Sequence, residues 1–173
     1  MPDGALPILD VRGLKPVFKI RGGEIHAVND VSFDLKPGEL LGVVGESGSG
    51  KSVTMMSLLG LLPTPPADIR GGTVMFDGQD LLQVDAETLR GVRGGKIGFI
   101  FQDPMTSLNP VYNVGMQIME PLRKHMGMTK KQASVRAKEL LELVGIPDAP
   151  QRLTYSPHQS SAGTPHRATI HLS

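Results

Sequence analysis

A glycine-rich segment between an apolar run and a helical stretch constrains this chain most. It is Gly45-Glu46-Ser47-Gly48-Ser49-Gly50-Lys51-Ser52, and it fits the pattern G-x-x-x-x-G-K-[ST] at every fixed position. Glycines let successive backbone N–H groups point inward at phosphate oxygens, the lysine adds a positive charge, and the serine hydroxyl is a ligand for Mg²⁺. A helix that follows would add its positive N-terminal end. The segment therefore predicts a phosphate-binding loop.

The flanking segments predict the α/β setting in which such loops occur. Leu40–Val44 is continuously apolar, as expected of a strand buried on both faces of a parallel sheet. Val53–Leu62 is apolar enough for a buried helix, and Pro63 ends it. Ile97–Phe101 predicts a second short apolar strand. We expect a P-loop core of the α/β class.

The remaining patterns place strands early in the chain and helices late. Val31–Leu35 alternates apolar and polar residues, and Gly72–Gly78 predicts a strand that ends in an Asp-Gly turn. Val114–His125 has helical spacing, and Thr129 is a candidate N-cap for a helix that ends at Gly145. We expect an N-terminal antiparallel β portion and a helical portion from about Val114.

Composition excludes several classes of protein. The 173 residues suffice for one compact domain, and the formal charge of +1 gives no global field for nucleic acid or an acidic membrane. The absence of cysteine excludes a disulfide framework and a thiolate metal site. Apolar runs such as Leu58–Leu62 are far shorter than the about 20 residues of a membrane span, and the N-terminus has no signal-peptide pattern. If the protein acts at a membrane, we therefore expect it to do so as a peripheral protein that does not cross the bilayer.

Three blocks of sequence carry a resemblance to a known family. They are Arg21–Phe33, the phosphate-binding loop, and Ile97–Pro110 with its run Phe-Gln-Asp-Pro-Met-Thr-Ser-Leu-Asn-Pro. Together they resemble the ATP-binding subunits of ABC importers, from about Leu9 to about Gln159. The second part of the last block is similar to the oligopeptide and dipeptide branch, which also includes nickel importers.

The resemblance implies roles for two further residues. Gln102 matches the glutamine of the Q-loop, whose amide would coordinate Mg²⁺ or the attacking water, and the loop after it would touch the membrane subunit. Without the resemblance, Gln102 could equally be a solvated residue that ends a strand. Phe18 sits where this branch stacks an aromatic ring on adenine, although a core aromatic is the alternative. His26 is a lone histidine in a turn, so a metal role is not expected.

The sequence departs from the family near its end. Ser161 and Gly163 align with the serine and second glycine of the signature motif, but Ala162 and Pro165 disturb the expected backbone. The strand that ends in Asp-Glu, which would hold Mg²⁺ and polarise water, has no counterpart. We therefore expect a partial nucleotide-binding domain over residues 1–153, helical over about 114–153, and a degraded signature region with an atypical tail over residues 154–173.

The resemblance implies an energy-coupling ATPase with ATP and Mg²⁺ as cofactors. Two such subunits, identical or different, would sandwich ATP and drive membrane-spanning permease subunits, served indirectly by an extracytoplasmic solute-binding protein. The protein would lie at the cytoplasmic face of the inner membrane, and no nucleic acid is expected as a partner. One alternative is a truncated remnant that binds nucleotide weakly or not at all and does not hydrolyse it. A small-molecule P-loop kinase is disfavoured, because nothing in that class requires the Phe101–Pro110 block.

Overall fold

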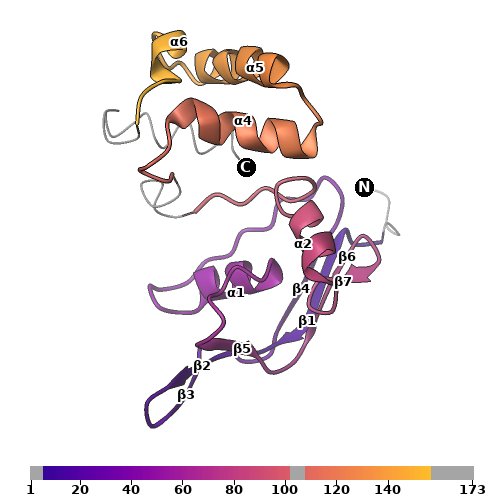
Figure 1. The fold of residues 1–173 in the computed structure, drawn as a ribbon. Helices are drawn as coiled ribbons and strands as arrows, with labels where there is room; N and C mark the ends of the chain where they lie inside the picture. Colours follow the sequence, from indigo (N-terminus) through magenta and orange to yellow (C-terminus); the bar gives the residue numbers. More distant parts are fainter. Residues whose placement is uncertain (1–5, 102–107, 157–173) are drawn as a thin grey trace. The chain divides into compact units, whose positions relative to one another are not determined.

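The structure, a computed structural model, describes residues 6–101 and 108–156. It divides the chain into two compact units, Met1–Leu89 and Arg90–Ser173. Strands dominate the first unit and helices the second, as Figure 1 shows by the colours of the chain. The predicted β and helical portions are thus confirmed. The predicted boundary at residue 153 stays a prediction.

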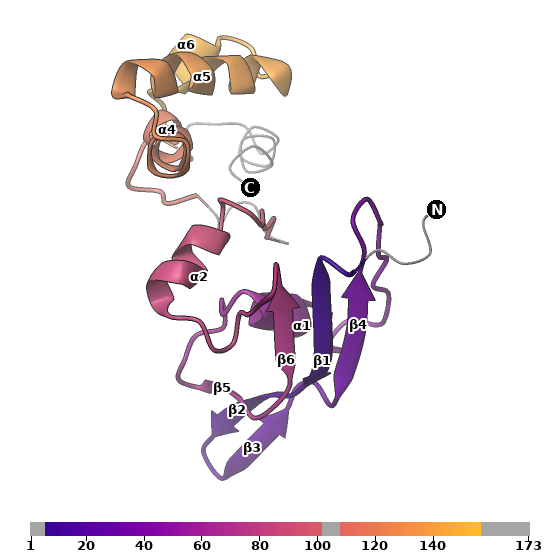
Figure 2. The same cartoon turned by 90° about the vertical axis from the view of Figure 1, so that its right-hand side faces the viewer.

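Two antiparallel sheets form the first unit. One has the strand order β4-β1-β6-β7 and the other the order β3-β2-β5. Figure 2 shows β4, β1 and β6 of the larger sheet side by side. The strands are β1 Leu9–Leu14, β2 Pro16–Ile20, β3 Gly23–His26, β4 Val31–Leu35, β5 Ala67–Ile69, β6 Thr73–Phe76 and β7 Gln79–Asp80.

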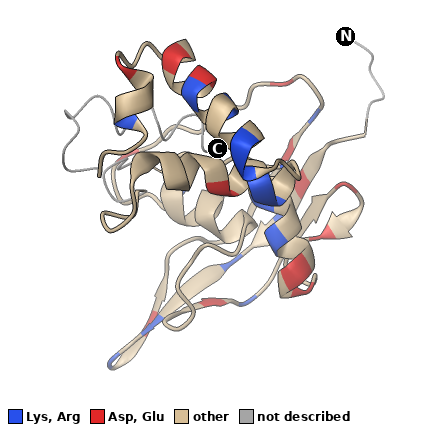
Figure 3. Ribbon diagram, turned by 45° about the horizontal axis from the view of Figure 1, so that its top comes forward, with Lys and Arg blue, Asp and Glu red and all other residues tan. Residues whose placement is uncertain are grey.

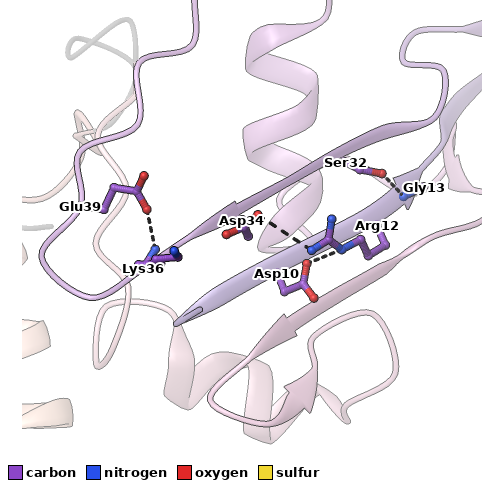
Figure 4. Close-up of polar contacts among 7 residues, drawn as sticks. All are labelled: Asp10, Arg12, Gly13, Ser32, Asp34, Lys36 and Glu39. Carbon is purple, nitrogen blue, oxygen red and sulfur yellow. Dashed lines mark hydrogen bonds and ion pairs between the residues drawn. The ribbon is translucent and has the colours of Figure 1, made fainter. Parts of the chain in front are cut away.

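Strand β1 has an apolar side in the core and a charged side turned outward. Val11 is fully buried, whereas Asp10 and Arg12 alternate with it on the other face. Asp10 lies directly opposite Asp34 of β4, and like charges in that position repel. The guanidinium of Arg12 offsets this repulsion, because its nitrogens lie 2.6 Å from Asp10 Oδ1 and 3.9 Å from Asp34 Oδ1 (Figure 4).

Helix α1, Lys51–Leu58, ends earlier than the apolar pattern predicts. Gly60 has a φ of +58°, the left-handed conformation that commonly follows the last helical turn. The N–H of Gly60 donates to the carbonyl of Ser57, and the N–H of Leu61 donates to that of Met56. These two bonds are the Schellman pattern, so the glycine ends the helix before Pro63.

Two predicted strands do not form in the described part of the chain. Residues 40–44 have no strand assignment, and Leu40 and Val44 are 97% and 92% exposed. Residues 97–101 form only a single parallel bridge, between Ile97 and Arg93. Both predictions are wrong for these residues, because a strand with two apolar faces needs neighbouring strands for its backbone hydrogen bonds. Among the described residues no strand pairs with either segment.

Helices α4 Val114–His125 and α5 Lys130–Leu143 pack into a hairpin in the second unit. The predicted cap is confirmed, since Thr129 and Gln132 form a reciprocal capping box. The predicted end is confirmed as well, because Gly145 takes a φ of +69° after the last turn of α5. The two short helices are α2 Ala86–Val92, across the boundary between the units, and α6 Ala149–Arg152.

Buried apolar side chains of α4, α5 and α6 form one cluster in the second unit. Its members are Val114, Ile118, Leu122, Ala133, Ala137, Leu140, Leu141, Ile146 and Ala149. Alanines on the inner face of α5 allow α4 to approach closely, because a methyl group fills little space between the helices. Within residues 6–101 and 108–156, no helix is long and apolar enough to cross a bilayer.

Candidate nucleotide-binding site

The start of α1 has backbone N–H groups with no side-chain acceptor. Gly50 is the N-cap residue, so it has no side chain to cap the helix, and the first turn contains no acidic residue. The first N–H groups of any helix lack partners within the helix and carry its partial positive charge. This end of α1 can therefore receive an anion.

Two of the three glycines in the loop have other atoms close to where a side chain would begin. A β-carbon built on Gly50 would stand 2.7 Å from the carbonyl oxygen of Ala27, and one on Gly45 would stand 2.9 Å from Ser49 Oγ. Gly48, in contrast, has open space around it and a φ of +82°. Packing against the main chain thus favours glycine at position 50, and a positive φ favours it at positions 48 and 50. The neighbour of position 45 is a serine hydroxyl, which can move.

Lys51 holds its ammonium group against the loop that precedes it. The Nζ atom donates to the carbonyl oxygens of Gly45 and Glu46 at 2.7 and 2.6 Å, and to Ser49 Oγ at 3.2 Å. All three acceptors are uncharged, and no ion pair joins Lys51 to a carboxylate among the described residues. The positive charge of the half-buried Lys51 is therefore not neutralised by a neighbour.

Hydroxyl groups on α1 fix the helix below the loop. The Thr54 hydroxyl donates to the carbonyl of Gly50 at 2.9 Å, and the Ser57 hydroxyl donates to that of Val53 at 2.7 Å. Both side chains are buried, so these bonds satisfy polar atoms that would otherwise destabilise the interior. Ser52 differs, because it is exposed and its hydroxyl makes no hydrogen bond within the described residues.

Phe18 is a half-buried residue of β2, opposite Ile25 of β3 and Ala67 of β5. The hairpin of β2 and β3 leads directly to Ala27, whose carbonyl lies beneath Gly50. The structure thus connects the strand of Phe18 to the phosphate-binding loop through one short segment. Sequence reasoning missed the role of Ala27 and Val28 as the support of Gly50, and the sequence offers no local signal for a contact made by a backbone carbonyl.

Three predicted site residues lie outside the described residues. They are Gln102 and the two signature positions, Ser161 and Gly163. His26 is exposed, and the described residues contain no group of three or more His, Asp or Glu side chains placed to hold a metal ion.

The sequence pattern of ABC transporters matches residues 28–172. The chain belongs to the ABC transporter family. It is 50% identical over 169 residues to a peptide import ATP-binding protein of Brucella melitensis, covering 95% of this chain and 50% of that protein. It is 48% identical over 163 residues to the oligopeptide transport ATP-binding protein OppD of Bacillus subtilis, covering 94% of this chain and 46% of OppD. The ABC chain described here thus spans about half the length of these relatives.

A solved ABC structure supports the same assignment. The dimeric ATP-binding cassette MJ0796, in a post-hydrolysis state bound to ADP and Pi, matches with a TM-score of 0.80 and 26% sequence identity. The match covers 95% of this chain and 68% of that cassette. The resemblance to ABC ATP-binding subunits is confirmed.

Proposed function

We propose that this chain binds ATP through Gly45–Ser52 and serves as the nucleotide-binding part of a peptide importer's ATP-binding subunit. The ammonium group of Lys51 carries the proposal. It is surrounded by three uncharged oxygen atoms at 2.6 to 3.2 Å, in a loop where a side chain at position 50 would meet the carbonyl of Ala27. A terminal phosphate would give this cation the anionic partner that it lacks, and hydrogen bonds to charged groups are roughly twice as strong as neutral ones.

The remaining groups at the loop suit the other parts of the nucleotide. The N–H groups at the start of α1 have no internal acceptor and would donate to phosphate oxygens. The exposed hydroxyl of Ser52 would hold Mg²⁺, joined by the amide of Gln102. Bound there, Mg²⁺ would neutralise charge on the phosphate oxygens. Phe18 would stack on the adenine ring.

The names of the relatives suggest which transport process ATP binding at this site would support. The Brucella protein is named for peptide import and OppD for oligopeptide transport. We propose that this chain acts with membrane-spanning permease subunits and a second ATP-binding subunit, at the cytoplasmic face of the inner membrane. A solute-binding protein outside the membrane would act through the permease. The dimeric state of MJ0796 supports the second subunit.

For a polypeptide of residues 1–173 taken by itself, nucleotide binding without hydrolysis is a second candidate, and the positions of its acidic residues favour it. Beyond residue 107, the acidic residues of the whole sequence are Glu120, Glu139, Glu142 and Asp148. Glu120 lies on α4, Glu139 and Glu142 lie on α5, and Asp148 precedes α6. None of them follows an apolar strand, where the family places the carboxylates that hold Mg²⁺ and polarise water.

The proposal is tested by titrating the purified chain with a fluorescent ATP analogue in the presence of Mg²⁺. Lys51→Ala should weaken binding by about 10- to 150-fold, because a hydrogen bond to a charged group contributes about 1.5–3 kcal/mol. Lys36→Ala is the matched control, since it removes an exposed lysine at a turn outside the loop. The turn of Lys36 is closed by main-chain and Glu39 contacts, as Figure 4 shows, and does not use the lysine side chain.

Competition with unlabelled nucleotides tests which phosphates the loop binds. ATP and ADP should displace the analogue, whereas AMP should not, because Lys51 is expected to contact the terminal phosphates of the longer chains. Equal affinity of the wild-type and Lys51→Ala proteins would contradict the proposed site. Displacement by AMP as effective as that by ATP would contradict the proposed orientation.

A further inference from the structure

Charge is distributed unevenly between the two units, although the whole chain is nearly neutral. The described residues of the first unit have seven Lys and Arg and eleven Asp and Glu, which gives a formal charge of −4. Those of the second unit have ten Lys and Arg and four Asp and Glu, which gives +6 with His neutral. The sequence-based expectation that charge attracts no acidic partner therefore does not hold for the second unit taken alone.

Four of these positive charges lie at one end of the hairpin of α4 and α5. Arg123 and Lys124 are in the last turn of α4, and Lys130 and Lys131 open α5. All four are exposed, and none forms an ion pair among the described residues. We call residues 123–131, whose sequence is Arg-Lys-His-Met-Gly-Met-Thr-Lys-Lys, the basic tip. Figure 3 shows blue at the start of α5 and red toward its other end.

Other positive residues on the same helix are neutralised locally. Arg136 donates to Glu139 at 2.8 Å, and Lys138 lies 3.6 Å from Glu142. These pairs join residues three and four positions apart, the spacing that stabilises a helix. The contrast between the two halves of α5 shows that the unpaired charge is confined to its first turn.

The stability of α5 does not account for Lys130 and Lys131. The N-terminus of a helix carries a partial positive charge, so acidic residues are favoured there and lysines are unfavourable. The first turn of α5 contains no acidic residue. Lys130 and Lys131 therefore oppose the partial positive charge at the start of α5, and helix stability gives no reason for them. Arg123 and Lys124 differ, because they lie at the C-terminal end of α4, where positive charge is favourable.

An apolar residue stands at the centre of the basic tip. Met126 is 67% exposed, and Gly127 beside it has a φ of +65°, which turns the chain between the two helices. Met128 instead packs against the buried cluster of the second unit and anchors the loop. The exposed methionine is therefore flanked by two positive charges on each side. This arrangement suits the boundary between lipid head groups and acyl chains.

We propose that the basic tip binds the surface of a membrane that contains anionic phospholipids. Arg123, Lys124, Lys130 and Lys131 would contact phosphate and carboxylate groups of the lipids, and Met126 would enter the interfacial region. A nucleic acid would also attract these charges, but the tip has no Phe, Tyr or Trp on which a base could stack, and the imidazole of His125 is its one aromatic ring. The exposed methionine therefore favours the lipid surface. This inference does not depend on nucleotide binding at Lys51.

The test measures binding of the full 173-residue chain to sedimented vesicles at low salt. Vesicles of phosphatidylcholine with phosphatidylserine are compared with vesicles of phosphatidylcholine alone. The double variant Lys130→Gln/Lys131→Gln should lower binding to anionic vesicles by at least about tenfold, since each basic residue near such a surface contributes roughly fivefold. The matched control Arg136→Gln/Lys138→Gln removes the same charge from the same helix and should change binding by less than about twofold. Circular dichroism checks that each variant keeps its helices.

Further variants and ligands make the outcomes decisive. Met126→Ser should weaken binding to anionic vesicles without changing the formal charge, and Lys51→Ala should leave vesicle binding unchanged. An equal loss of binding to anionic vesicles in the two double variants would overturn the proposal, because it would show that binding depends on the total charge of the protein and not on the basic tip. Equal binding to neutral vesicles would overturn it too, because exposed apolar residues elsewhere would then be responsible. Tighter binding to a DNA duplex or single strand than to anionic vesicles would assign the tip to nucleic acid instead.

Discussion

Gly50 and Ala27 are in direct contact, and this contact joins the end of the β2–β3 hairpin to the start of α1. A β-carbon at position 50 would lie 2.7 Å from the Ala27 carbonyl oxygen and 3.0 Å from Cγ2 of Val28. Real β-carbons do not approach a backbone oxygen so closely, so any side chain here would displace the loop. The position of Lys51 therefore depends on Gly50, although Gly50 has no functional group that could contact a ligand.

We expect Gly50→Ala to destabilise the protein more than Gly48→Ala. Both glycines have positive φ, +90° and +82°, so both variants incur about 1–2 kcal/mol of backbone strain. Only position 50 adds a steric clash, which should cost a further 1–3 kcal/mol or so. The midpoint of urea unfolding, followed by circular dichroism, measures the difference. Equal midpoints for the two variants would show that Ala27 does not press on the loop.

The sequence predicted the elements whose signals are local. The capping box of Thr129 and the terminal Gly145 define α5 within a few residues, and both were recognisable from residue type and position. The Asp-Gly pair after β6 was predictable for the same reason. The phosphate-binding loop was recognised from its own pattern, but its support by Ala27 depends on a backbone contact across more than twenty positions.

The failed predictions concern elements that require distant partners. Leu40–Val44 has the composition of a central strand, yet Leu40 is 97% exposed and no described strand pairs with the segment. An apolar composition indicates that a segment is suited to burial, but it does not indicate which other part of the chain will cover the segment. Met116 is a smaller case of the same limit. It lies within the predicted helix Val114–His125, yet it is 51% exposed, because a shift of one position along a helix moves a side chain to a different face.

Gln117 is expected to hold the segment that follows the Q-loop position. Its Oε1 accepts from the N–H of Asn109 at 2.7 Å, and its Nε2 donates to the carbonyls of Asn109 and Tyr112, both at 3.0 Å. Gln117→Ala should destabilise the protein by about 1–3 kcal/mol, because three main-chain groups lose a partner. Gln151→Ala is the control, since the side chain of Gln151 is exposed and makes no hydrogen bond among the described residues.

Proteolysis distinguishes a local from a global effect of Gln117→Ala. Cleavage near Val111 and Tyr112, both exposed, should become faster in the variant than in the Gln151→Ala control. Gln117→Glu should behave at least as badly as the alanine variant, because it keeps the acceptor but faces two carbonyl oxygens with a carboxylate. Unchanged cleavage in both Gln117 variants would rule out this role.

Asp85 should make the start of α2 sensitive to acid. Hydrogen bonds from the Thr88 N–H and hydroxyl, and from the N–H of Glu87, favour the carboxylate and lower its pKa below the ordinary value of 3.8. A lowered pKa in the folded state means that ionised Asp85 stabilises the fold above about pH 4, and this contribution disappears as the pH falls through the lowered pKa. Hydrogen exchange of the Thr88 amide, measured down to strongly acidic pH, follows the effect.

The variant Asp85→Asn isolates the contribution of this one carboxylate. Asparagine still accepts hydrogen bonds at a helix N-terminus, but it does not titrate. Protection of the Thr88 amide from hydrogen exchange should therefore depend less on pH in the variant than in the wild type. The other acidic residues are the same in both proteins, so their contribution cancels in the comparison. Parallel pH profiles in the two proteins would mean that Asp85 is not responsible.

A polypeptide of residues 1–173 should bind ATP and hydrolyse it only at a trace rate. Phosphoryl transfer in P-loop proteins requires a carboxylate that holds Mg²⁺ and a group that orients the attacking water. Glu120, Glu139 and Glu142 lie on helices of the second unit, and Asp103, outside the described residues, is followed by Pro104. The loss of one positioned catalytic group commonly lowers a rate by 10²–10⁴-fold, and two such groups are absent from this sequence.

Phosphate release from the folded chain measures this expectation, with full-length OppD of Bacillus subtilis assayed beside it. The chain should release phosphate at least about 10²-fold more slowly than OppD, and Lys51→Ala should leave that residual rate unchanged. Folding is checked in the same samples by circular dichroism and by binding of the fluorescent ATP analogue. A rate close to that of OppD, abolished by Lys51→Ala, would show that another residue supplies the missing carboxylate. Glu39, which precedes the loop, and Glu46, which belongs to it, would then be the first candidates to replace by glutamine.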